Sequence, residues 1–245
     1  MNYSRYPLML LLYSCFLMIS CRGDNKGVSS PVTEKGSWFS EKFWCHRVNT
    51  IEKVHRVGNK CRGLEIDLFF LDDTLFVKHD EEDSAKLTLP QLMSAIQDSE
   101  FHYYWFDLKN IDENNSKAFS SALIAVIKDF SSIGNCVVES WMPSCMKIFV
   151  DAGCHTSFFI NLSGMNTDED VKVRIDNITE YVTKYKISAI SSVEADYAFM
   201  NKYFPHFNKL TWYTGTNRSY IDSLVAHINN DITMQVCLLE ESVLR

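Results

Sequence analysis

From Phe43 to the C-terminus, the sequence alternates between short apolar runs of strand length and longer segments with helical periodicity. The apolar runs predict eight strands, at 43–47, 63–69, 103–108, 135–139, 157–161, 187–191, 209–213 and 233–238. Seven helices are predicted between them, at 50–59, 89–98, 115–130, 143–152, 168–184, 195–203 and 218–228. Strands that alternate with helices form parallel βα units, so this order predicts an α/β fold.

Two architectures accommodate such an order, a closed barrel and a doubly wound open sheet. No glycine-rich GxGxxG or GxxxxGK[ST] motif follows the first predicted strand, which removes the usual reason to favour the open sheet. The roughly 205 residues from Trp38 onward lie at the compact end of barrel sizes. We therefore predict a compact (β/α)8 TIM barrel over residues 38–245. A short extra hairpin strand, at 74–78, is expected to pair with the second strand through a turn at Asp72-Asp73.

The N-terminus predicts export. Residues 7–19 are an apolar run, and Arg5 is the only charged residue among the first twenty. This run is too short to span a membrane and has the length of a signal-peptide core. The residues 17–21 that follow, Leu-Met-Ile-Ser-Cys, resemble the lipobox of bacterial lipoproteins. We expect residues 1–20 to be a lipoprotein signal peptide, Cys21 to be lipidated, and residues 21–37 to form a flexible tether.

Charge and cysteine content restrict the partners further. The formal net charge of −7 provides no basic surface for nucleic acid, so we expect none as a partner. The protein would instead be anchored by lipid to a bacterial membrane, on its periplasmic or cell-surface side. Disulfides are possible in such a compartment. We single out Cys45 with Cys61 as the pair to test among six candidates, the others being Cys136, Cys145, Cys154 and Cys237.

Polar side chains gather at the predicted ends of the first strands. Glu65 and Asp67 are two positions apart, so they share one face of their strand, while Leu64, Ile66 and Leu68 share the other. The third predicted strand ends in Asp107-Leu108-Lys109, the first in His46-Arg47, and the hairpin strand in His79-Asp80. In a barrel, the carboxyl ends of the strands face the active site, so we expect these groups at one rim.

Together these groups are suited to phosphate chemistry. Three carboxylates, Glu65, Asp67 and Asp107, form a hard oxygen site suited to Ca²⁺ or Mg²⁺ rather than zinc. His46 and His79 could flank a phosphodiester, one taking a proton from the nucleophile and the other giving one to the leaving alcohol. Arg47 and Lys109 could neutralise the phosphate oxygens.

The same residues resemble the motifs of the glycerophosphodiester phosphodiesterase family. The matching segments are His46-Arg47, Glu65-x-Asp67, Val77-x-His79-Asp80, Leu87-Thr88-Leu89 and Asp107-Leu108-Lys109, with weaker matches at 137–140 and 211–214. The resemblance implies a (β/α)8 barrel and hydrolysis of a small phosphodiester to glycerol 3-phosphate and an alcohol. It also implies that Glu65, Asp67 and Asp107 hold a divalent metal, that His46 and His79 are the catalytic acid and base, and that Arg47 and Lys109 bind the phosphate.

Two departures from the family pattern leave alternatives open. Val48 stands where the family has glycine, and Asp107 where it has glutamate. A ligand-binding lipoprotein on a degenerate barrel, without turnover, is one alternative. A lyase that forms a cyclic phosphate is another. Further along the chain, Glu139, Asn161 and Trp212 lie at predicted strand ends, where they either line the pocket or serve only in packing and local polar contacts.

Overall fold

A computed structural model describes residues 36–58, 60–84, 86–97, 100–162, 165 and 167–244. Within these ranges the sheet has nine strands, of which eight run parallel and one short antiparallel strand lies outside them. The parallel strands are β1 (Phe43–Cys45), β2 (Gly63–Leu71), β4 (Tyr103–Leu108), β5 (Cys136–Ser140), β6 (His155–Phe159), β7 (Ala189–Val193), β8 (Asn208–Tyr213) and β9 (Met234–Leu239). The predicted signal peptide and Cys21, with the tether as far as residue 35, lie outside the described residues.

The sheet closes into a barrel because β1 pairs in parallel with both β9 and β2. This closure confirms the predicted (β/α)8 TIM barrel over the open sheet. The extra strand, β3 (Thr74–Val77), is antiparallel to β2. The turn between them has positive φ angles of 48° at Asp72 and 56° at Asp73, the backbone that a tight two-residue hairpin requires.

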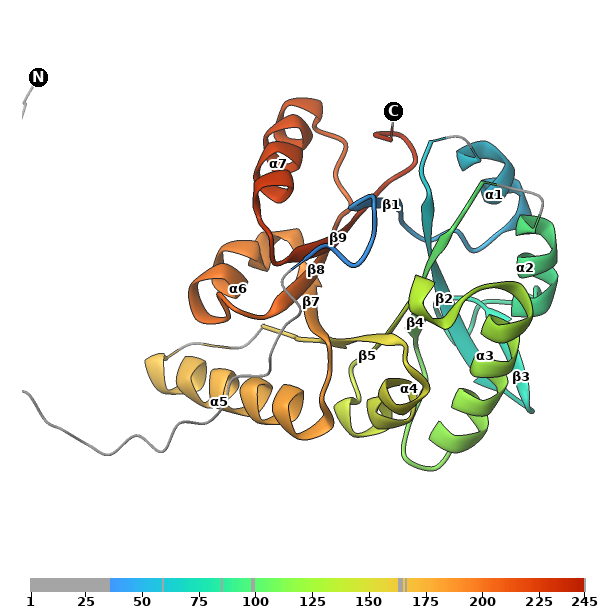
Figure 1. Ribbon diagram of the computed structural model, residues 1–245, viewed down its shortest axis with the longest axis horizontal. Helices are drawn as coiled ribbons and strands as arrows, with labels where there is room; N and C mark the ends of the chain where they lie inside the picture. Colours follow the sequence, from blue (N-terminus) through green and yellow to red (C-terminus); the bar gives the residue numbers. More distant parts are fainter. Residues whose placement is uncertain are drawn as a thin grey trace, which may run out of the picture. The chain divides into compact units, whose positions relative to one another are not determined.

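The helices surround the strands, as Figure 1 shows. They are α1 (Ile51–Val57), α2 (Leu89–Ile96), α3 (Ser116–Phe130), α4 (Lys147–Ala152), α5 (Asp168–Tyr185), α6 (Tyr197–Tyr203) and α7 (Arg218–Asn230). Side chains at their first turns explain two of the starts: Gln91 accepts a hydrogen bond from the Thr88 N–H, and Thr167 and Asp170 cap each other's N–H groups. None of the helices in the described part of the chain is long and apolar enough to cross a bilayer.

Successive side chains of each strand point alternately outwards, under the helices, and inwards, into the barrel. Leu64, Ile66 and Leu68 of β2 are fully buried beneath the surrounding helices, as the sequence predicts. A second apolar cluster fills the barrel itself, and it includes Trp44 and Trp105. Inside the barrel, the ring of Trp44 lies so close to Gly63 that a Cβ added there would be 2.2 Å from it.

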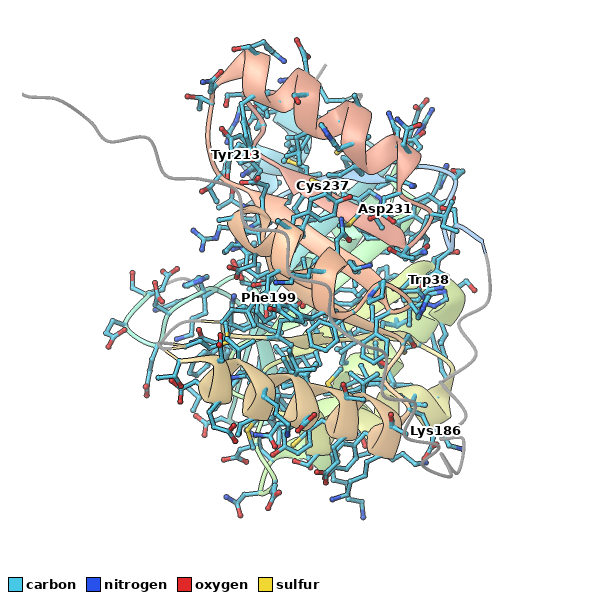
Figure 2. The ribbon with its side chains drawn as sticks, turned by 90° about the vertical axis from the view of Figure 1, so that its left-hand side faces the viewer. Trp38, Lys186, Phe199, Tyr213, Asp231 and Cys237 are labelled. Atoms are coloured by element: carbon cyan, nitrogen blue, oxygen red, sulfur yellow. The ribbon has the colours of Figure 1, made fainter. Side chains whose placement is uncertain are left out.

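The segment before β1 covers the end of the barrel at which the strands begin. Trp38 stacks on His155 with ring centroids 4.3 Å apart, and Phe39 packs edge-on against Trp44. In Figure 2, Trp38, Lys186 and Asp231 lie towards the right, at this end of the strands, while Tyr213 at the carboxyl end of β8 lies towards the left. The opposite, carboxyl end of the barrel is therefore where the polar side chains can meet a ligand.

Candidate active site

Three carboxylates meet at the carboxyl end of β2 and β4. Asp67 is in register with Asp107 on the neighbouring strand, and Glu65 precedes Asp67 on the same face. Ligand oxygens of these three side chains all lie within 4.8 Å of one another. Glu65 and Asp67 are almost completely buried, with 2% and 1% of their surface exposed. The predicted co-location of the three carboxylates is thus present in the fold.

Lys109 is the cation in contact with this cluster. Its Nζ lies 2.7 Å from Asp67 Oδ1 and also forms an ion pair with Asp107. Burial works against the lysine charge, but Asp107 and Asp67 outweigh it and raise the pKa of Lys109. The pKa of Asp67 is lowered because Lys109 and a hydrogen bond from Asn49 outweigh the effect of burial.

The pKa of Glu65 is shifted in the opposite direction from that of Asp67. Burial raises its pKa well above the ordinary value for glutamate, and the neighbouring Asp67 and Asp107 add to the shift. Three carboxylates thus face one lysine, so the cluster carries more negative charge than Lys109 neutralises when all three are ionised. Hard oxygen donors at this spacing fit Ca²⁺ or Mg²⁺.

Asn49 holds Asp67 in place. Its Nδ2 donates to Asp67 Oδ2 at 2.5 Å, and its Oδ1 accepts from the backbone N–H of Asp67 at 3.0 Å. Asn49 is not among the residues that the sequence motifs predict for the site. The signal that could have found it is its position three residues after His46, in the loop that leaves β1 at the same rim.

His46 is held by a carboxylate from the far end of the chain. Its Nδ1 lies 2.9 Å from Oε1 of Glu240, the first residue after β9, and its Nε2 lies 3.9 Å from Glu65 Oε2. Lys53 fixes the backbone by donating to the His46 carbonyl at 2.8 Å. Sequence reasoning missed Glu240, although its place directly after the last strand marks it as a rim residue.

His79 lies at the more open side of the site, with 38% of its side chain exposed. Its Nδ1 is 2.7 Å from Asp80 Oδ1, and its Nε2 is 3.2 Å from Nη2 of Arg47. Because a guanidinium can only donate, His79 Nε2 is the acceptor in this contact and the ring proton is on Nδ1. The contact therefore leaves a proton-accepting nitrogen beside a cation.

The backbone at Arg47 turns the chain out of β1. Its φ angle of 52° lies in the left-handed region, and its N–H donates to Glu65 Oε2 at 2.6 Å. This turn ends β1 at Cys45, two residues earlier than the sequence predicts. The next residue, Val48, is fully buried in the core beneath the helices, so its side chain does not line the site.

These groups line one cavity of about 420 Å³. Its polar wall contains His46, Arg47, Glu65, His79, Asp107, Lys109 and Glu139, and its apolar wall contains Trp105, Leu108, Trp141, Phe159, Trp212 and Leu238. The pocket positions considered for Glu139 and Trp212 are confirmed, whereas Asn161 is not among the lining residues.

The six cysteines of the described ranges are free thiols, Cys45 and Cys61 among them.

Fold and site together define a (β/α)8 barrel with a carboxylate cluster and two histidines at the carboxyl end of its strands. No family model and no curated protein matches the sequence. Solved structures do match. A glycerophosphodiester phosphodiesterase from Parabacteroides distasonis is 14% identical, with 81% of this chain and 92% of that chain covered and a TM-score of 0.60. A phosphodiesterase from Oleispira antarctica, solved with the product sn-glycerol-3-phosphate, is 11% identical, with 83% and 94% covered and a TM-score of 0.60.

A third matching structure is an enzyme of a different reaction class. Phosphoribosyl anthranilate isomerase from Thermococcus kodakaraensis is 11% identical, with 84% of this chain and 90% of that chain covered and a TM-score of 0.53. The chain therefore has the barrel fold of glycerophosphodiester phosphodiesterases, a fold that carries other chemistry as well. The activity must be argued from the site.

Proposed function

We propose that this chain is a divergent glycerophosphodiester phosphodiesterase, a metal-dependent enzyme that hydrolyses glycerophosphodiesters or related phospholipid headgroups. One observation carries the proposal: His46, His79, Arg47 and Lys109 share a single cavity with the carboxylate cluster. A barrel that only bound a ligand would not require two histidines at the same place as three carboxylates. The likeness in fold to phosphodiesterases supports the same reaction class.

Glu65, Asp67 and Asp107 would hold the divalent cation, Ca²⁺ or Mg²⁺. When bound, the cation supplies Lewis-acid stabilisation of the negative charge that develops on the phosphate. Lys109, held between Asp67 and Asp107, brings a positive charge to the same place. Arg47 is the second cation of the cavity, and its guanidinium can present two parallel N–H donors to phosphate oxygens.

The two histidines have different surroundings, which supports different roles. His79 presents an accepting Nε2, so we assign it the role of general base. It would take the proton of the attacking hydroxyl group, which belongs to water or to the substrate's own glycerol. His46 has its Nδ1 occupied by Glu240, which leaves Nε2 on the side of Glu65 and the cavity. We assign His46 the donation of a proton to the leaving alcohol.

The proposal extends to location, which rests on the sequence alone. The apolar run and lipobox-like residues before Cys21 support export and attachment to a bacterial membrane by lipid. An enzyme held there would encounter glycerophosphodiesters released from phospholipids. The barrel, on this proposal, is a lipoprotein domain that works outside the cytoplasm.

Phosphorus NMR of the protein with glycerophosphodiesters and simple lysophospholipids tests the activity. Each substrate is incubated with Ca²⁺, with Mg²⁺ and with EDTA. Glycerol 3-phosphate that appears only with metal supports the hydrolase. A cyclic phosphate would instead identify a lyase, and unchanged spectra from a folded, metal-bound protein would favour a ligand-binding barrel.

A further inference from the structure

A fourth carboxylate, Glu139, lies beside the cluster of three and has no role in the mechanism above. It is on β5, in register with Asp107 of the neighbouring strand β4. Only 3% of its surface is exposed, and it lines the same cavity as Glu65 and Asp107. Its Oε2 makes no hydrogen bond of normal geometry among the described residues, although the Ser191 and Ser157 hydroxyls lower the pKa of Glu139 against the larger opposing effect of burial. A buried carboxylate oxygen without a partner is costly, so its retention calls for an explanation.

The charges around Glu139 do not neutralise it. Lys109, which lowers the pKa of Glu139 through its charge, has its Nζ bonded to Asp67 and Asp107. Four carboxylates therefore share the cavity with two permanent cations, Lys109 and Arg47, which leaves an excess of two negative charges when all four carboxylates are ionised. A divalent cation would offset this excess.

We propose that Glu139 is a fourth carboxylate ligand of the cation site and that it favours Ca²⁺ over Mg²⁺. The inference rests on the proposed function, because it assumes that Glu65, Asp67 and Asp107 hold a metal. Ca²⁺ accepts six to eight oxygen ligands in flexible geometry, whereas Mg²⁺ retains several waters and uses one or two carboxylates. A site with four carboxylates suits the larger ion.

The position of Glu139 gives it the necessary reach. Neighbouring strands are about 4.8 Å apart, so residues in register on β4 and β5 start close together. The Glu139 carboxylate is not among the three whose ligand oxygens lie within 4.8 Å of one another, so it would turn towards them to bind the ion, and the glutamate side chain has one methylene more than Asp107 for this movement. Glu139 is in register with Ser157 on β6, whose buried hydroxyl has no partner among the described residues. Ser157 can donate to the second carboxylate oxygen and orient the first.

Metal binding by the intact protein tests this inference without reference to turnover. Calorimetric titration with Ca²⁺ and with Mg²⁺ gives the affinities. Tb³⁺ luminescence provides a second readout, because the buried indole of Trp105 lines the cavity and can sensitise the ion. For Glu139→Gln we expect Ca²⁺ affinity to fall by about tenfold or more, with a smaller change for Mg²⁺. Glu180→Gln, an equal loss of charge on the exposed surface of α5, should leave both affinities unchanged.

Thermal unfolding separates ligation from a structural role. In EDTA, Glu139→Gln should be at least as stable as the wild type, because burial disfavours the charged form of Glu139 and the neutral amide removes that cost. The increase in Tm that Ca²⁺ produces should be smaller than in the wild type. If Glu139→Gln fails to fold, Glu139→Asp keeps the charge but withdraws it by one methylene, and it should also weaken Ca²⁺ binding.

Wild-type Ca²⁺ affinity in a folded variant at position 139 would overturn the role of Glu139 and leave the proposed function standing. A wild-type protein that binds none of Ca²⁺, Mg²⁺ and Tb³⁺ would overturn both the fourth ligand and the metal dependence of the proposed enzyme. The two failures are thus distinguishable in one set of titrations.

Discussion

The Nδ1 of His46 lies 2.9 Å from Oε1 of Glu240, which joins the loop after the first strand of the barrel to the residue after the last. This hydrogen bond occupies one imidazole nitrogen and leaves the other on the side of the cavity. The pKa of Glu240 is lowered, chiefly by its hydrogen bond with His46, against the opposing effect of burial. Glu240 is thus a positioning residue for His46.

Replacing Glu240 with Gln should lower kcat by about 10- to 100-fold, because the amide lacks the negative charge that stabilises the protonated imidazole and can present its NH2 group in place of the accepting oxygen. Phosphodiester turnover across pH measures the effect, and the profile itself should shift. The neighbouring Glu241→Gln is the matched control, since Glu241 pairs with Arg56 and Lys60 rather than with His46. Equal pH profiles for the two variants would contradict the role of Glu240.

His79→Asn should reduce turnover by about 10²- to 10⁴-fold, the range expected for loss of a general base. Its half-exposed side chain predicts a change in unfolding free energy within about 0.5 kcal/mol. Activity and thermal unfolding of the same preparation separate the two effects. His55→Asn, on the exposed surface of α1, serves as control. Turnover near the wild-type level would remove His79 from the mechanism.

In EDTA, the stability of the protein should fall as pH rises above about 4.3, the ordinary pKa of glutamate. Glu65, whose folded-state pKa is raised by burial, keeps its proton in the folded chain after the unfolded chain has lost it. The unfolded state then binds fewer protons, so the free energy of unfolding decreases with pH until the folded-state pKa is passed. Glu65→Gln should flatten this slope in urea unfolding at several pH values. An unchanged slope would assign it to other groups.

Gly63→Ala should destabilise the barrel by about 1–3 kcal/mol, because the new methyl group would lie 2.2 Å from the Trp44 ring in a packed interior. Urea unfolding gives the difference. Gly134→Ala, where nothing lies within 4 Å of the added carbon, is the control and should change stability far less. If both variants were equally stable, the close packing of Trp44 on β2 would be refuted.

Cys21→Ala should release the protein from membranes if Cys21 carries a lipid, since the acyl chains supply the attachment. Cell fractionation followed by detection of the intact protein measures the distribution. Cys136→Ala, a change at a buried thiol of β5, controls for the loss of a cysteine. A wild-type protein found wholly in the soluble fraction would contradict the anchor.

Local sequence determined much of this fold. The alternation of strand and helix, the turn at Asp72-Asp73 and the shared face of Glu65 and Asp67 all follow from interactions between residues near in the chain. Such interactions leave periods of two and of about 3.6 residues in the sequence, so the elements and their faces can be predicted from it. The rim location of His46 and His79 followed once the barrel was assumed.

The tertiary structure alone decided which distant groups touch. His46 and Glu240 are 194 positions apart, and Asn49, in the loop after β1, contacts Asp67 on the neighbouring strand β2. Glu139 faces Asp107 only because β5 pairs with β4 in one register. The periodicity of the local sequence cannot predict these contacts, because they depend on how the eight strands are staggered when the sheet closes on itself. The sequence therefore determined the elements and the chemical character of the rim, and closure of the barrel determined the partners of each side chain.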